Sequence, residues 1–192
     1  RRWDPEVIRL AGELRSGAWG AVRSVSGVYN KGALNNGCHM IDLLHLLLGK
    51  LVLRQAFPPV HDMLADDPSI PVVLSAPGSV TVQLGCGNAG DYALFELQLV
   101  TQKGVIAMEG GGLHWRIRTA EQSPVFDGYR TLDDGMQRSG GLGLAMLRAV
   151  TQIHDVALNG GTLSSNGANA LQAEQLCEAM RRLATGSDSS TQ

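Results

Sequence analysis

The sequence predicts an α+β fold, an open and mostly antiparallel β-sheet with helices packed on one face. Helical apolar patterns occur in residues 4–17 and 37–48, and again after residue 140. Between them, residues 51–132 carry short β-rich segments separated by turn residues, with no convincing helix. This order of helix, strand, helix, a block of strands and two helices differs from the strict alternation of an α/β protein.

Length and composition indicate one globular domain. The chain has 192 residues, of which 44% are hydrophobic, enough for one substantial core. We expect a single domain over residues 1–186 and a disordered tail over residues 187–192, where the sequence reads SDSSTQ. No apolar run reaches the roughly 20 residues that span a bilayer, and no N-terminal stretch has the pattern of a signal peptide.

Charge and cysteine usage exclude several classes of function. The formal net charge is -2, and no basic run is longer than an Arg-Arg pair, so neither nucleic acid nor a membrane is an expected partner. The three cysteines, Cys38, Cys86 and Cys177, are widely spaced and form no CxxC pair, which argues against a disulfide framework and a zinc site. We therefore expect no metal and a reducing, cytoplasmic location.

Three elements are predicted in the first 50 residues. Asp4, Pro5 and Glu6 form a typical helix start, and the apolar stripe that follows ends near Gly17. Residues 21–29 carry spaced valines and predict a strand. A second helix is expected over residues 37–48, capped at its start by Asn35 or Asn36 and ending at Gly49.

The central block predicts a series of strands. Alternation of buried-type residues is clearest at Phe95, Leu97 and Leu99, and Lys103-Gly104 is a good hairpin turn before the pattern resumes. Two helices are expected after this block: one from Leu144 that ends at residues 159–160, and one that begins after residues 165–167 and ends at Gly186. The predicted strands cover residues 52–58, 72–74, 79–84, 92–101, 105–109 and 114–119.

A GxGxxG pattern occurs at residues 85–90, directly after a predicted strand. It would bind a dinucleotide only if the following residues formed a helix, because the pyrophosphate is held at a helix N-terminus. Residues 92–101 alternate like a strand, although a helical stripe through Ala93, Leu94, Leu97 and Val100 is the alternative. We interpret the glycines as a hairpin loop.

The segment from Tyr29 to Gly49 gathers polar groups at the start of an apolar helix. His39 faces the positive end of the helix dipole, which favours a neutral imidazole able to accept a proton. Asp42 lies one turn later and is suited to orient His39 or bind a hydroxyl, while Asn35 and Asn36 are suited to bind substrate hydroxyls. The competing interpretation is a core histidine, a capping asparagine and an aspartate that satisfies the backbone.

The chain as a whole resembles the C-terminal domain of the glucose-fructose oxidoreductase, inositol dehydrogenase and MocA (Gfo/Idh/MocA) family. The features in family order are the Arg1-Arg2-Trp3 opening, the turn at residues 17–20, the Lys103-Gly104 hairpin and the two closing helices. The most specific segment, GALNNGCHMID at residues 32–42, is similar to the family pattern G-x-L-x-D-x-G-x-H-x-x-D with some shift. The resemblance implies that His39 is the catalytic base and that Asn35 replaces the aspartate that supports it.

The same resemblance implies an NAD- or NADP-dependent oxidoreductase that transfers a hydride at a sugar, polyol or nucleotide-sugar carbon. The family's E-K-P lysine and Rossmann domain are absent from these residues, so we expect a fragment that binds no cofactor and is inactive alone. Asp42, Asn36, Lys31 and Tyr29 are expected to bind substrate, and Arg2 to lie near the cofactor at the domain junction. Expected partners are the protein's own Rossmann domain and further copies joined through the sheet face. The alternative is a non-catalytic binding or assembly module with the same fold.

Overall fold

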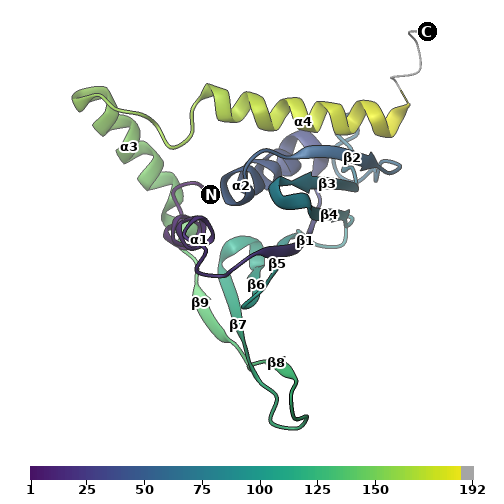
Figure 1. Cartoon of the computed structure of the whole chain (residues 1–192). Coiled ribbons are helices and arrows are strands. Elements are labelled where there is room, and N and C mark those ends of the chain that lie inside the picture. Colours follow the sequence, from purple (N-terminus) through teal and green to yellow (C-terminus); the bar gives the residue numbers. More distant parts are fainter. Residues whose placement is uncertain (187–192) are drawn as a thin grey trace.

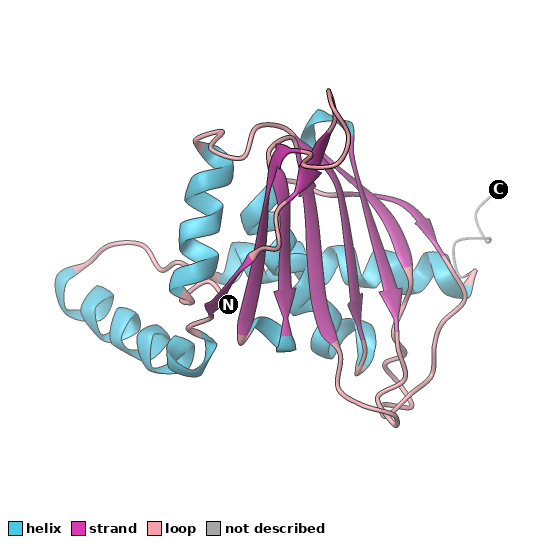
Figure 2. Ribbon diagram, turned by 90° about the horizontal axis from the view of Figure 1, so that it is seen from below, coloured by secondary structure: helices cyan, strands magenta, loops and turns pink. Residues whose placement is uncertain are grey.

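The computed structural model describes residues 1–186 and has the expected α+β architecture (Figure 1). One mixed sheet has the order β2-β3-β4-β1-β5-β6-β7-β8, and β9 pairs with β7. In Figure 2 the strands stand in front of α2 and α4, so one face of the sheet is covered and the other is open. The tail predicted over residues 187–192 lies outside the described residues.

The helices and strands follow the predicted order with small shifts of their ends. The helices are α1 (Pro5–Arg15), α2 (Cys38–Leu48), α3 (Ala145–Asn159) and α4 (Gly167–Thr185). None of these helices, within residues 1–186, is both long and apolar enough to cross a membrane. The strands are β1 (Val22–Tyr29), β2 (Val52–Ala56), β3 (Val72–Ala76), β4 (Val80–Cys86), β5 (Phe95–Thr101), β6 (Gly104–Glu109), β7 (His114–Gln122), β8 (Arg130–Leu132) and β9 (Met136–Ser139).

Local chemistry explains where the predicted elements begin and turn. Asp4 accepts a hydrogen bond from the Glu6 backbone N–H, as expected of an N-cap before Pro5. The β5–β6 hairpin is tied by Thr101, whose hydroxyl donates to the Gly104 carbonyl at 2.8 Å and accepts from the Gly104 N–H at 3.1 Å. The predicted N-terminal helix and the Lys103-Gly104 hairpin are therefore confirmed.

The core lies between the sheet and α2. In β5 and β6 every second residue is buried, and these positions face the helices. Helix α2 packs an almost wholly apolar face against these buried strand residues. The members of the core with the least exposure include Met40, Ile41, Leu44, Leu97, Leu99 and Ile106.

The glycine-rich segment after β4 is neither a dinucleotide loop nor a hairpin. No helix follows it, since β5 begins at Phe95. Strands β4 and β5 are not neighbours either, because both pair with β1, so the predicted hairpin is wrong. The loop crosses the end of β1, where Asn30 holds it by donating to the Tyr92 carbonyl at 2.7 Å and accepting from the Leu94 N–H at 3.0 Å.

Strands β8 and β9 were not predicted. Both are short and mostly exposed, so they lack the apolar alternation that marks a half-buried strand. They form by pairing with β7, which is longer than predicted and extends to Gln122. Together these strands make a ribbon that projects from the body of the domain (Figure 1).

Tyr29 ends β1 and ties it to the segment before β3. Its hydroxyl donates to the Ile70 carbonyl at 2.9 Å and accepts from the Ile70 N–H at 3.0 Å, inside the core. Burial also raises the pKa of the phenol above its usual value. The expected role of Tyr29 in substrate binding is corrected to a structural one, because the side chain is fully buried.

We predict that Tyr29→Phe lowers the free energy of unfolding by about 1–3 kcal/mol, because two buried backbone groups lose their partner. Urea unfolding of the 192-residue chain measures this difference. The matched control is Tyr92→Phe, since the Tyr92 side chain is exposed and should contribute within about 0.5 kcal/mol. Equal stability of Tyr29→Phe and the wild type would contradict the assigned role.

Candidate active site

The chain enters α2 through an irregular turn. Lys31 and Gly32 both have left-handed backbone conformations, with φ of 68° and 89°, and residues Gly32–Gly37 form a π-helical turn that runs directly into α2. A left-handed pair followed by a wide turn leaves the first backbone N–H groups without helical partners. These donors must be satisfied by other parts of the chain.

A distant segment, residues 67–69, supplies the acceptors. The Gly32 N–H donates to the Ser69 hydroxyl at 2.9 Å, and the Ala33 N–H to the Pro68 carbonyl at 3.1 Å. The Asp67 carboxylate accepts from the Leu34 and Asn35 N–H groups at 3.0 and 2.9 Å. Asp67 therefore does the work of an N-cap from 33 residues away along the chain.

Gly32 is required by this arrangement. A Cβ atom at this position would lie 2.1 Å from a carboxylate oxygen of Asp67, in addition to the strain of a positive φ. The close approach of Asp67 to the backbone thus depends on the missing side chain.

The predicted caps, Asn35 and Asn36, do not cap α2. Their side-chain amides donate backwards, Asn35 to the Lys31 carbonyl at 2.9 Å and Asn36 to the Asn30 carbonyl at 3.0 Å. The expectation was wrong because the π-helical turn moves the start of the helix and Asp67 already occupies the free N–H groups. Asn35 makes no hydrogen bond with His39 within residues 1–186.

His39 lies in the first turn of α2, and its ring is exposed. Partial desolvation and the positive charge of Arg1 lower its pKa below the usual 6.5, while Asp42 acts in the opposite direction. The ring has no hydrogen-bond partner among the described residues. A neutral imidazole with both nitrogens free can accept a proton from a ligand near pH 7.

Asp42 is held by Arg2. The Arg2 Nε atom lies 2.9 Å and 3.0 Å from the two carboxylate oxygens, and Nη2 lies 2.7 Å from one of them. The Arg2 and Asp42 side chains are only 11% and 24% exposed, so these hydrogen bonds are largely shielded from water. Arg2 also reaches the Ser164 carbonyl, just before α4, at 3.4 Å.

These residues border a cavity of about 370 Å³ between the start of α2 and the first half of α4. His39 and Asp42 line it from α2. Larger hollows of about 390, 630 and 770 Å³ are lined by neither His39 nor Asp42. We consider the cavity of about 370 Å³ the candidate site because two groups meet there: the imidazole of His39, which has no hydrogen-bond partner among the described residues, and the carboxylate of Asp42, which Arg2 holds in place. Its lining consists of Leu34, Cys38, His39, Asp42, Ser165, Ala170, Ala173 and Glu174.

The sequence reasoning found part of this lining. His39 and Asp42 come together as predicted, whereas Asn35, Asn36 and Lys31 do not line the cavity. Ser165 and Glu174 were missed, because they follow residues 29–49 by more than a hundred positions and belong to no motif. Burial raises the pKa of the Cys38 thiol at the wall, which disfavours the thiolate.

The glycine pattern at residues 85–90 does not form a dinucleotide-binding loop. The loop at residues 85–90 leads into β5 and not into a helix, so no helix N-terminus faces a pyrophosphate there. Arg2, expected near the cofactor, is engaged by Asp42. Within residues 1–186, no group of three or more His, Cys, Asp or Glu side chains is placed to hold a metal ion.

Comparisons with known proteins establish the fold. No protein-family model and no curated protein sequence matches the chain. Among solved structures, an oxidoreductase from Agrobacterium radiobacter in complex with NAD+, L-tartaric acid and magnesium matches 97% of this chain with a TM-score of 0.68 and 17% identity. KijD10, a 3-ketoreductase from Actinomadura kijaniata in complex with NADP, matches 93% with a TM-score of 0.64 and 18% identity.

A third match is a super-repressor mutant of Gal80p from Saccharomyces cerevisiae, which covers 97% of this chain with a TM-score of 0.72 and 12% identity. The chain spans only 57–62% of the length of these three structures. These matches show that the chain has the same fold as the matched part of these structures, in agreement with the expected fold.

We predict that Arg2 and Asp42 are energetically coupled. A double-mutant cycle of Arg2→Ala, Asp42→Ala and both together should give a coupling of about 1–2 kcal/mol, since the pair is bidentate and shielded. Urea unfolding of the four proteins measures it. As a control, the exposed pair Arg116 and Glu109 should give no more than about 0.5 kcal/mol. Strictly additive effects at Arg2 and Asp42 would contradict the prediction.

Proposed function

We propose that this chain is the substrate-binding domain of an NAD- or NADP-dependent oxidoreductase that acts on a hydroxyl or carbonyl group of a sugar, polyol or nucleotide sugar. The observation that carries the proposal is the cavity in which the free imidazole of His39 lies beside the fixed carboxylate of Asp42. The matched oxidoreductases, which share the fold, support the same class of activity.

In this proposal His39 acts as the base for the substrate hydroxyl. Its lowered pKa keeps the ring neutral near pH 7, so a ring nitrogen can accept the hydroxyl proton. Asp42, held by Arg2, accepts a hydrogen bond from a second hydroxyl and fixes the substrate relative to His39. Ser165 and Glu174 supply further polar contacts from the α4 side.

The nicotinamide cofactor would be bound outside these 192 residues. This proposal is supported by the loop at residues 85–90, which leads into a strand, and by the matched structures, which extend well beyond the region shared with this chain. We propose that a dinucleotide-binding domain of the same protein completes the site. The isolated chain would then bind substrate without turning it over.

A second candidate is a binding module without turnover. Two observations favour it. One matched structure, Gal80p, is described as a super-repressor mutant and not as an enzyme. In addition, the Asn35 amide donates to the Lys31 carbonyl and does not support His39. In that case the cavity would retain ligand binding and His39 would be dispensable for it.

We also propose that copies of the protein assemble through the open face of the sheet. No described helix covers this face in Figure 2, and its side chains are mostly small or polar. A flat, uncovered sheet face is suited to pack on an identical face across a two-fold axis.

We predict that His39→Ala lowers kcat by about 10²–10⁴-fold when the chain is joined to its dinucleotide-binding domain, because the general base is lost. Cofactor affinity should stay unchanged, since His39 contacts the substrate. Steady-state kinetics on a panel of sugars, polyols and nucleotide sugars, with cofactor titration, makes the measurement.

The control for this experiment is His114→Ala, an exposed histidine on β7 away from the cavity, which should keep full turnover. Full turnover in His39→Ala would exclude the base role. Retained ligand binding without turnover in the unmutated protein would favour the binding module.

A further inference from the structure

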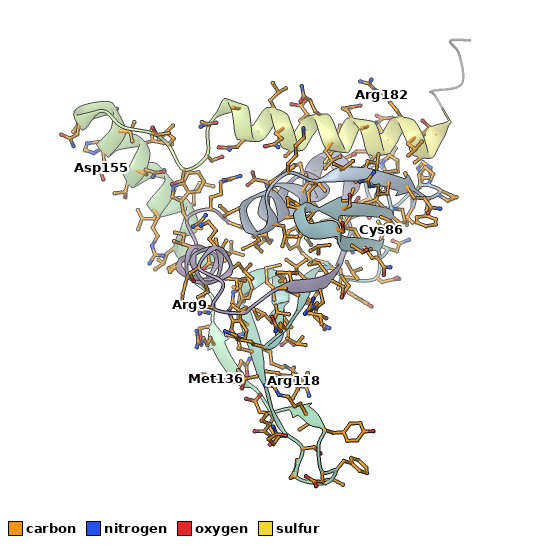
Figure 3. The ribbon with its side chains drawn as sticks, in the orientation of Figure 1. Arg9, Cys86, Arg118, Met136, Asp155 and Arg182 are labelled. Atoms are coloured by element: carbon orange, nitrogen blue, oxygen red, sulfur yellow. The ribbon has the colours of Figure 1, made fainter. Side chains whose placement is uncertain are left out.

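The candidate site makes no use of a ribbon that projects from the fold. We call residues 120–135 the arm. Strand β7 pairs with β6 only as far as Thr119 and continues to Gln122 paired with β8 alone. Figure 3 shows Arg118 and Met136 at the base of the arm, which extends away from the body of the domain.

The arm projects on the open side of the sheet. In Figure 1 it hangs below the sheet, opposite to α2 and α4. In Figure 2, seen from below, the arm stands in front of the strands while those helices lie behind them. Anything packed on the open face would therefore lie beside the arm.

The tip of the arm exposes apolar and aromatic side chains. Val125, Phe126 and Tyr129 are 75%, 65% and 70% exposed, and the two rings stack edge to face at 6.4 Å. The sequence has only three Phe and three Tyr, so two neighbouring exposed rings are a large share of its aromatic content. Exposed aromatic clusters of this kind are typical of surfaces that a partner covers.

The tip is also ordered by its own hydrogen bonds. The Ser123 hydroxyl accepts from the Val125 and Phe126 N–H groups at 3.3 and 3.0 Å, and the Ser123 N–H donates to the Tyr129 carbonyl at 2.9 Å. At the base, Asp133 accepts from the Thr119 N–H at 2.9 Å. A tip held in this way presents its rings without a large ordering cost on binding.

The open face supplies area but few strong anchors. Eight strands at a spacing of about 4.8 Å and lengths of about five residues give it a plan area of roughly 600 Å². A standard interface buries about 800 Å² on each partner and relies on aromatic or arginine anchors. The alternation of the strands places small, polar and oppositely charged side chains on this face, among them Ser24, Ser26, Glu96, Gln98, Glu109 and Arg116.

We propose that the arm clasps a second copy of this chain that is packed on the open face, with Phe126 and Tyr129 as its anchors. The proposal rests on the assembly through the sheet face put forward above and adds to it the element that holds the two copies together. Arg116 already pairs with Glu109 of the same copy, so the second copy is favoured by area and by the aromatic anchors rather than by free charges. In a two-fold arrangement each copy would contribute both an open face of roughly 600 Å² and an arm, and together these would reach the area of a standard interface. Two arms related by that axis would close the dimer from both sides.

Sedimentation velocity of the 192-residue chain over a range of concentrations tests the proposal. The double variant Phe126→Ser/Tyr129→Ser should raise the dimer Kd at least about 30-fold, as expected when a pair of anchors is removed. The matched control is Tyr92→Ser, since Tyr92 is 67% exposed outside the arm, and it should leave the Kd unchanged. Ser26→Arg, at the centre of the open face, tests the assembly surface itself.

The outcomes separate the two proposals. If both the arm variant and Ser26→Arg dimerise more weakly than the wild type, the arm proposal is supported. If only Ser26→Arg dimerises more weakly and the arm variant keeps the wild-type Kd, the arm proposal is overturned and the assembly through the open face stands. A wild-type chain that remains monomeric, or a Tyr92→Ser variant as weak as the arm variant, overturns the arm proposal. These readouts do not depend on turnover, so failure of the proposed enzymatic activity would not mimic them.

A photo-crosslinking residue in place of Phe126 provides a second measurement that does not depend on the folding of the serine variant. Mixed light and heavy isotope samples distinguish crosslinks within one copy from those between copies. Crosslinks from position 126 to open-face residues of another copy are expected. Crosslinks confined to the same copy would overturn the proposal.

Discussion

The geometry of the candidate site depends on the hydrogen bonds that residues 67–69 make to the start of α2. The chain leaves β1 through a left-handed pair and a π-helical turn, which exposes N–H groups that no helical carbonyl can reach. Asp67 and Ser69 accept from them, and Tyr29 ties the adjoining Ile70 to the end of β1. Without these acceptors the turn would carry unsatisfied donors, and His39 would have no fixed position.

The same segment also holds the opposite wall of the cavity. Arg181 of α4 donates to the Asp66 carbonyl at 2.8 Å, so the loop before β3 contacts β1, α2 and α4. Arg2 makes a second connection, from Asp42 on α2 to the Ser164 carbonyl before α4. Two separate clamps therefore set the distance between the helix that carries His39 and the helix that carries Glu174.

Sequence reasoning succeeded where the signal was local. The cap at Asp4, the alternation in β5 and the Lys103-Gly104 turn each lie within a few residues of the element they define. It failed where a partner came from far along the chain. Nothing near Asn35 indicates that Asp67 caps the turn, and the pattern after β4 does not reveal that β5 pairs with β1 instead. The sequence indicated the polar residues that α2 contributes to the site, but it gave no sign of the residues that come from α4 and the loop before it.

Hydrogen exchange in an Asp67→Ala variant tests most directly whether Asp67 holds the start of α2. Loss of the carboxylate should remove protection from the amides of Leu34 and Asn35 and increase exchange through His39, while the β5–β6 hairpin keeps its protection. Asp67→Asn keeps one acceptor oxygen, so its protection of these amides should lie between that of the wild type and that of Asp67→Ala. Unchanged protection over residues 32–39, or an equal loss across the whole sheet, would contradict the account.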